Sequence, residues 1–197
     1  MYILSRIQDL IRIPPSAFNT PIQHAITDEL HKKYSNKVIN GLGLAISVWD
    51  LLKIEDGMLK TGDGGSYVDV EFRLVVFKPF VNEILQGWVA GCTEAGIKLR
   101  LDFFDDIWVP KEYLFEGCTY KSEDNVWVWR PDADDPESEL FFDINEKVRF
   151  RIEEEMFVNT KPKSGYETEE EIAKKPAAYW LKASMQLEGM GCTSWWD

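Results

Sequence analysis

The chain has 197 residues, of which 45% are hydrophobic and 13% aromatic, including eight tryptophans. This composition supplies enough apolar surface for a packed core and excludes disorder over most of the length. The formal net charge of −12 disfavours a general attraction to phosphate, because Lys and Arg provide the sequence-independent part of nucleic-acid affinity. Strong non-specific DNA binding is therefore not expected.

The cysteines and the apolar stretches indicate the kind of compartment. Cys92, Cys118 and Cys192 form no Cys-x-x-Cys pair and have no nearby histidine, so we expect reduced, partly buried thiols and no zinc site. No stretch approaches the roughly 20 apolar residues that cross a bilayer. We therefore expect a soluble intracellular protein that contacts no membrane and holds no metal or other cofactor.

The chain begins with a predicted strand and a predicted helix. Apolar and polar residues partly alternate over residues 2–13, and the strand should end at the two prolines that follow. Residues 20–23, Thr-Pro-Ile-Gln, have the form of a capping box with proline at the first helical position. Apolar residues then recur at helical spacing, at Ile22, Ala25, Ile26 and Leu30. A helix to about residue 35 follows from this pattern.

Strand signals fill the rest of the first half. Residues 38–49 are rich in β-branched and apolar side chains, and Gly41 and Gly43 suggest a bend or bulge near the start of that strand. Residues 60–66 are rich in glycine and form a loop. A strand then runs from residue 67 toward Pro79, with alternate apolar residues on one face. The first 80 residues thus predict an α+β domain, with one helix packed on an antiparallel sheet.

The second half, residues 81–197, is predicted to be an all-β barrel of the OB type. Short strands separated by Gly, Asp or Pro recur at intervals of roughly ten residues. The first pair is expected over residues 83–91 and 96–101, followed by a strand over residues 103–109 that stops at Pro110. Two acidic segments, 132–139 and 167–171, interrupt the pattern and match no motif.

Residues typical of catalysis do not form a plausible site. His24 and His31 are seven apart on the predicted helix, a rise of roughly 10 Å that is too long for one metal ion, so we expect surface histidines. Asp105 and Asp106 are neighbours on a predicted strand and should point to opposite faces. The glycine-rich loop lacks the Gly-Lys-Ser/Thr ending of a phosphate cradle and leads into a strand. No catalytic residue is assigned.

Two predicted strands carry positive charge on one face only. Strict alternation sends Lys147, Arg149 and Arg151 to the face opposite three apolar residues, and Lys98 and Arg100 repeat this arrangement. Single-stranded nucleic acid lies over such a face in many OB barrels, held by cations and by aromatic rings beneath its bases. Candidate aromatic platforms are Trp108, Trp127 and Trp129. The alternative is that the charges solvate the outer face while the tryptophans fill the core or a protein interface.

Several segments together resemble the larger stalk subunit of RNA polymerases, over nearly the whole chain. They are Arg-Ile-Pro-Pro at residues 12–15, Val-Val-Phe-Lys-Pro-Phe at 75–80, Glu-Ile-Leu-x-Gly at 83–87 and Phe-Phe-Asp-Asp-Ile at 103–107. The Phe-Lys-Pro-Phe segment is similar across this family. The first and last of these segments, with the ending Ser-Trp-Trp at 194–196, resemble the RNA polymerase III member.

This resemblance implies a non-catalytic nuclear subunit that acts in transcription initiation. It implies an N-terminal tip domain docked on the RNA polymerase III core, a tight heterodimer with a small helical stalk partner, and contact of the OB barrel with single-stranded nascent RNA. The loop of Gly62, Asp63, Gly64 and Gly65 is the candidate contact with the core enzyme, with an ordinary surface turn as the alternative. The competing function is a free-standing OB-type single-stranded RNA-binding protein, and a hydrolase is a remote third.

Overall fold

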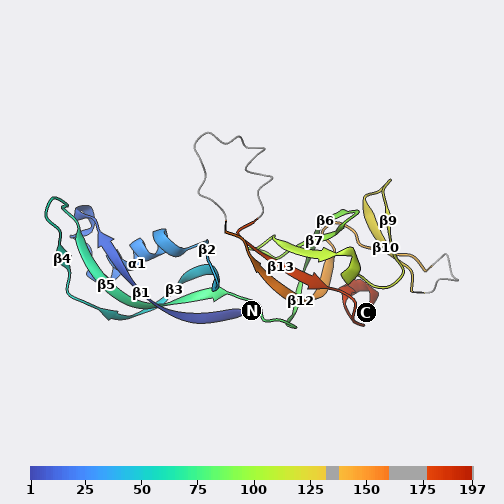
Figure 1. Ribbon diagram of the computed structural model, residues 1–197, viewed down its shortest axis with the longest axis horizontal. Helices are drawn as coiled ribbons and strands as arrows, with labels where there is room; N and C mark the ends of the chain where they lie inside the picture. Colours follow the sequence, from blue (N-terminus) through green and yellow to red (C-terminus); the bar gives the residue numbers. More distant parts are fainter. Residues whose placement is uncertain (132–137, 160–176, 197) are drawn as a thin grey trace. The chain divides into compact units, whose positions relative to one another are not determined.

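The computed structural model describes residues 1–131, 138–159 and 177–196. The chain divides into two compact units, Met1–Pro79 and Phe80–Asp197, whose elements are labelled in Figure 1. Within the described residues, the first unit combines one α-helix with strands and the second consists of strands and short 3-10 turns, so the predicted α+β class is confirmed.

The first unit is an antiparallel sheet with a helix on one face (Figure 1). The strand order is β1-β5-β3-β2, and β4 pairs with β5. Its elements are β1 (Tyr2–Ile13), η1 (Pro15–Ala17), α1 (Ile22–Tyr34), β2 (Lys37–Ile39), β3 (Gly43–Ile54), β4 (Met58–Leu59) and β5 (Ser66–Phe77).

The core of this unit lies between the sheet and α1. Every second residue of β5 is completely buried, from Val68 to Val76, because alternate side chains of a strand point to the same face. The helix contributes Ala25, Ile26 and Leu30 to the same cluster. The predicted helix and the predicted apolar face of the last strand are therefore both confirmed.

Two local predictions for this unit are wrong. The predicted single strand over residues 38–49 is two antiparallel strands, since the chain reverses between Ile39 and Gly43, which face each other across the β2–β3 hairpin. Gly41, with a φ of +76°, permits this turn. The predicted capping box is also absent, because α1 begins after Pro21 and no side chain caps its N-terminus.

The second unit is a closed barrel with an additional small sheet. The barrel strands are β6 (Ile84–Thr93), β7 (Gly96–Arg100), β8 (Ile107–Pro110), β12 (Lys147–Phe157) and β13 (Tyr179–Ser184). The chain also forms η2 (Lys111–Tyr113), β9 (Cys118–Lys121), β10 (Val126–Trp129), β11 (Leu140–Phe141), β14 (Gly191–Cys192) and η3 (Thr193–Trp195). Strands β9, β10 and β11 form the small sheet, and β14 pairs with β12.

The pairing of the barrel strands is that of an OB fold. Strands β6, β7 and β8 pair in succession, β12 pairs antiparallel with β6, and β13 closes the barrel by pairing with β12. The β13–β8 pair is parallel. This five-stranded Greek-key closure confirms the predicted OB-type barrel.

A glycine at the start of β7 allows β7 and β8 to approach closely. Gly96 begins β7 with a φ of +154°, and a Cβ atom there would lie only 2.2 Å from the carbonyl oxygen of Val109 on β8. A residue with a side chain cannot occupy this point without moving the backbone. The predicted hairpin of residues 83–101 is confirmed, with Cys92 and Thr93 belonging to β6.

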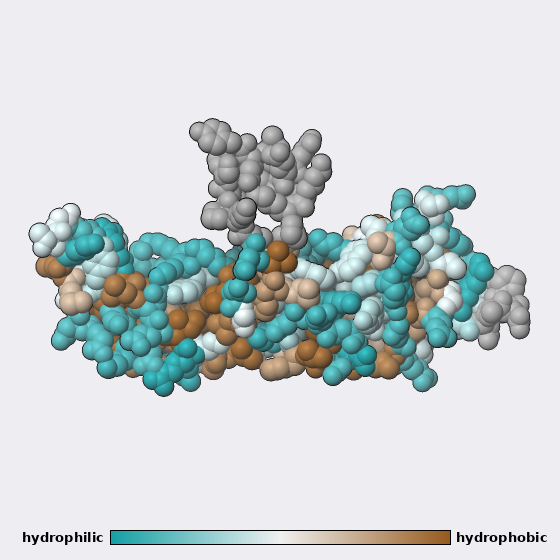
Figure 2. Space-filling view, viewed as in Figure 1, coloured by the Kyte–Doolittle hydropathy of each residue, from teal (hydrophilic) through white to brown (hydrophobic). Residues whose placement is uncertain are grey.

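The predicted acidic segments fall largely outside the described residues. Of residues 132–139, only Ser138 and Glu139 are described, and Glu139 accepts hydrogen bonds from Lys121 (2.6 Å) and Arg130. Residues 167–171 lie outside the described part of the chain. Hydrophilic residues occupy much of the face visible in Figure 2, with hydrophobic areas between them.

Candidate nucleic-acid interface

The outer face of the barrel is set by the alternation of residues along its strands. In β7, Ile97 and Leu99 are completely buried, which sends Lys98 and Arg100 outward. In β12, Val148 and Phe150 are likewise buried, which sends the flanking cations outward. The two cationic faces that the sequence predicts are therefore both present on the barrel.

Strand pairing then places cations on both sides of two outward tryptophans. Trp108 on β8 is paired with Lys98 on β7 and with Lys182 on β13. Trp88 on β6 is paired with Arg100 on β7 and Lys147 on β12. We call these two rows of side chains the cation–tryptophan face, defined by Trp88, Trp108, Lys98, Arg100, Lys147 and Lys182.

Contacts within this face fix some of its side chains. The Arg100 guanidinium lies 5.4 Å from the centre of the Trp88 ring, a cation–π distance, and also donates a hydrogen bond to Asn145 (3.2 Å). The Lys182 ammonium lies 4.6 Å from the ring centre of Tyr113. Neither cation is paired with a carboxylate in these contacts, so they leave its charge uncompensated.

The three cations predicted on β12 differ in their surroundings. Arg151 donates two hydrogen bonds to one carboxylate oxygen of Glu153, at 2.8 and 2.5 Å, so its charge is compensated by its neighbour on the same face. Lys147 and Arg149 have no ion-pair partner within the described part of the chain. Only these two of the three are positioned as uncompensated phosphate contacts.

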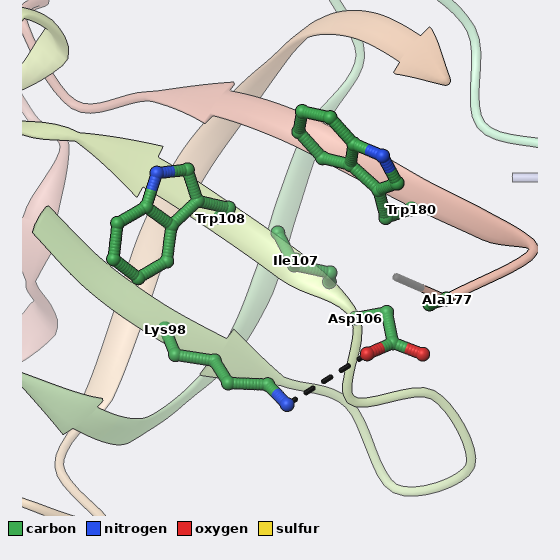
Figure 3. Close-up of a pocket in the computed structure, with 6 residues that line it drawn as sticks. All are labelled: Lys98, Asp106, Ile107, Trp108, Ala177 and Trp180. Atoms are coloured by element: carbon green, nitrogen blue, oxygen red, sulfur yellow. Dashed lines mark ion pairs between the residues drawn. The ribbon is translucent and has the colours of Figure 1, made fainter. Parts of the chain in front are cut away.

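A hollow of about 270 Å³ opens on this side of the barrel at β7, β8 and β13. Figure 3 shows Trp108 and Trp180 at its sides and Lys98 extending toward Asp106, with a 3.7 Å ion pair between them. Ile107 and Ala177 complete the lining. Asp106 precedes β8, so the expectation of Asp105 and Asp106 as neighbours within a strand is wrong.

The carboxylate of Asp106 is in an unfavourable position for its charge. Burial raises the pKa of Asp106, and the neighbouring Asp105 raises that pKa further, while Lys98 acts in the opposite direction. A polar pair therefore sits at the edge of a largely apolar hollow between two indole rings.

The sequence analysis missed three residues on this side of the barrel. It also proposed Trp127 and Trp129 as aromatic platforms, and these lie elsewhere. Trp88, Trp180 and Lys182 were missed, although alternation with the buried Tyr179, Leu181 and Ala183 indicates that residues 180 and 182 face outward.

The two other candidate platforms lie elsewhere in the barrel unit. Trp127 is only 5% exposed and donates a hydrogen bond to the carbonyl of Thr93 (2.8 Å). Trp129 stacks on Phe115, with ring centres 4.4 Å apart, and contacts Trp195 and Trp196. Both tryptophans therefore contribute to packing and neither lies on the cation–tryptophan face.

In the first unit, the glycine-rich loop is tied to β1 through Asp63. The Asp63 carboxylate accepts hydrogen bonds from Arg12 (2.8 and 2.6 Å), from the Tyr67 hydroxyl (2.6 Å) and from the Gly65 amide (3.1 Å). These donors, Arg12 first, hold the pKa of Asp63 far below its usual range. Gly62 has a φ of +83°. The loop is thus a fixed turn.

The histidines and cysteines are arranged as structural residues. His24 is exposed, as expected, whereas His31 is half-buried and accepts a hydrogen bond from the Val48 amide (3.3 Å), so the expectation of a surface residue is wrong there. Burial raises the pKa of all three thiols, that of Cys118 to about 12. Among the described residues, no cluster of His, Cys, Asp or Glu is suited to hold a metal ion, and no helix is long and apolar enough to cross a membrane.

The fold and this face define a two-unit protein of the OB-barrel class, with an α+β unit before the barrel. The family model described as RNA polymerase III subunit Rpc25 matches residues 83–196, and the model of the SHS2 domain found in the N terminus of Rpb7p and Rpc25p matches residues 8–64. The chain belongs to the RNA polymerase III subunit Rpc25 family.

Three polymerase subunits align with this chain over all of its length. DNA-directed RNA polymerase III subunit RPC8 of Saccharomyces cerevisiae is 49% identical, and the alignment covers all of both chains. The Schizosaccharomyces pombe subunit of that name is 44% identical, also over all of both chains. The Bos taurus subunit is 41% identical over all of this chain and 98% of its own length. The prediction of a non-catalytic polymerase subunit, and not an enzyme, agrees with this membership.

Proposed function

We propose that this chain is a stalk subunit of nuclear RNA polymerase III whose barrel binds single-stranded nascent RNA while the polymerase initiates transcription. Full-length similarity to subunits named for that enzyme supports the assembly. The observation that carries the RNA-binding role is the cation–tryptophan face, where cross-strand pairing places a cation on each side of Trp88 and Trp108.

The chemistry of this face suits a single strand. Lys and Arg neutralise phosphates, and exposed indole rings stack with bases that are not paired. The face includes β7 and β8, the second and third barrel strands, which commonly carry oligonucleotides in OB folds. The net charge of −12 does not oppose this role, because strand pairing brings four cations, Lys98, Arg100, Lys147 and Lys182, together on this face. Lys98, Arg100, Trp108, Lys147 and Arg149 are the proposed RNA contacts, and Arg151 contributes less because it is bound to Glu153.

The first unit is the proposed dock for the polymerase core. The loop of Gly62 to Gly65 is held by Asp63, so little conformational entropy is lost when it binds. Beside it lies a hollow of about 370 Å³ lined by Phe18, Ile22 and Leu59 among others, and Leu59 is 75% exposed. An exposed apolar area next to a rigid loop is typical of a protein contact.

Other exposed apolar residues of the first unit support a heterodimer with a small helical partner. Tyr2, Leu4 and Trp49 are exposed by 49%, 50% and 63%. Large apolar side chains with this much exposure are typical of a protein interface. We assign them to the stalk partner.

Affinity purification tests the assembly. A tagged copy expressed in cells should localise to the nucleus and recover the large RNA polymerase III subunits and one small helical protein. Recovery of ribosomes or RNA-processing factors in their place would favour a free-standing RNA-binding protein and would contradict the proposal.

The core contact is tested with a matched pair of glycine substitutions. Gly62 and Gly41 both have positive φ, +83° and +76°, and a Cβ atom at either would meet nothing within 4 Å. Asn tolerates such backbone angles, so Gly62→Asn and Gly41→Asn should both fold. We expect Gly62→Asn alone to weaken assembly with purified core polymerase, and equal assembly of both variants with the wild type would make the loop an ordinary turn.

A further inference from the structure

The hollow between Trp108 and Trp180 has a shape and a polar edge that the general attraction of cations for phosphate does not explain. Its two indole rings offer apolar faces, and Figure 3 shows Lys98 and Asp106 meeting at its margin. The Lys98 ammonium and the Asp106 carboxylate are 3.7 Å apart. A phosphate would be repelled by Asp106, so this carboxylate has no use in a site that holds only the RNA backbone.

A nucleobase satisfies both parts of this hollow. Its π-face stacks on an indole ring, and this stacking is tolerant of sequence because every base has such a face. Selectivity must then come from hydrogen bonds to the base edge. Asp106 accepts hydrogen bonds and Lys98 donates them, so the hollow requires a base edge that has donors next to an acceptor.

Guanine fits this requirement better than the other bases. Its Watson–Crick edge presents two neighbouring donors, N1–H and the N2 amino group, next to the O6 acceptor. A carboxylate can accept from both donors at once while an ammonium beside it donates to O6. Adenine, cytosine and uracil each offer the carboxylate a single donor site on that edge, which leaves one carboxylate oxygen without a base partner.

We propose that this hollow is a guanine-reading site, in which an unpaired guanine of the RNA lies against Trp108 and Trp180 with its Watson–Crick edge toward Asp106 and Lys98. The assignment rests on the proposed binding of single-stranded RNA by the barrel, and it adds a base preference to it. Burial raises the pKa of Asp106, and two N–H donors from guanine would compensate the desolvation of that carboxylate. The remaining cations hold the flanking phosphates.

The test compares single-base changes in the ligand. The full chain is titrated with labelled oligouridines of about nine nucleotides, within the usual site size of an OB fold, carrying guanine, inosine, adenine or uracil at the central position. A bidentate contact to a base corresponds to roughly five- to 150-fold discrimination, and we expect about tenfold tighter binding of the guanine oligonucleotide than of the uracil one. Inosine lacks the N2 amino group and should bind about fivefold more weakly than guanine.

Two substitutions that change the net charge by the same amount distinguish a direct role of the hollow from a general effect of charge. Asp106→Asn removes one of the two carboxylate acceptors and should abolish the preference for guanine over inosine. Asp105→Asn is the control, since Asp105 is exposed, does not line the hollow, and changes the net charge equally. Thermal unfolding checks that both variants fold. If Asp106→Asn does not fold, the base series on the wild type still tests the preference for guanine.

Each outcome has a distinct meaning. Equal binding of all four oligonucleotides would overturn the guanine site and leave the proposed RNA binding in place. Absence of binding to any of them at low salt would overturn both. Loss of the preference in Asp105→Asn as much as in Asp106→Asn would assign it to overall charge and would also overturn the site.

Discussion

The salt dependence of RNA binding depends on which cations of β12 reach phosphate. Lys147 and Arg149 have no carboxylate partner within the described residues, whereas Arg151 is bound to Glu153. For single strands, the slope of log K against the logarithm of the salt concentration is about −0.7 for each phosphate contacted. Removing two contacts in the double variant Lys147→Ala/Arg149→Ala should therefore reduce the slope by about 1.4.

This change of slope is large enough to measure. Between about 50 and 200 mM salt, a fourfold range, a slope difference of about 1.4 means that the wild type loses roughly sevenfold more affinity than the double variant. Fluorescence anisotropy of a labelled oligouridine at several salt concentrations measures both slopes. Arg151→Ala is the matched control on the same strand, and its slope should stay close to that of the wild type because its charge is already compensated.

Two results would refute this reasoning. An unchanged slope in the double variant would show that the outward charges of β12 only solvate the barrel. A slope for Arg151→Ala that falls by about 0.7 would show that Arg151 leaves Glu153 to bind phosphate, so the ion pair does not withhold its charge.

Three further predictions concern the fold. Gly96→Ala should destabilise the barrel by about 1 to 3 kcal/mol, measured by urea unfolding, because its backbone angle and the nearby Val109 carbonyl exclude a Cβ atom. Phe72→Ala should cost about 3 to 5 kcal/mol in the same assay, since Phe72 is fully buried in the first unit. The lowered pKa of Asp63 means that its pairing with Arg12 stabilises the fold fully above the unfolded-state pKa of about 4 and is lost as pH falls toward the folded-state value. The urea midpoint of Asp63→Asn should therefore fall less than that of the wild type between about pH 5 and 3, and an equal fall would contradict the assignment.

Local pattern in the sequence was enough to predict much of the architecture. Alternation identified the buried face of β5 and the outward cations of β7 and β12, because the side-chain period of a strand is two whatever the strand pairs with. Glu153 lies two residues after Arg151, so the same period places both on one face of the strand. This spacing indicates that Glu153 can compensate the charge of Arg151. The hairpin between β2 and β3 was missed because a glycine in an apolar run is compatible with both a bend and a reversal.

The composition of the candidate site depended on pairing between distant parts of the chain. Trp108 and Trp127 have equally apolar neighbours, yet the first faces outward between Lys98 and Lys182 while the second is buried and bonded to Thr93, 34 residues away. Strand register decides such outcomes, and it is fixed by contacts across the whole barrel. The sequence by itself therefore determined the α+β class, most of the strands and the sign of charge on single strand faces. Only the tertiary structure placed Trp180 beside Trp108 and Lys98 beside Asp106, because closure of the barrel brings together residues that no local pattern connects.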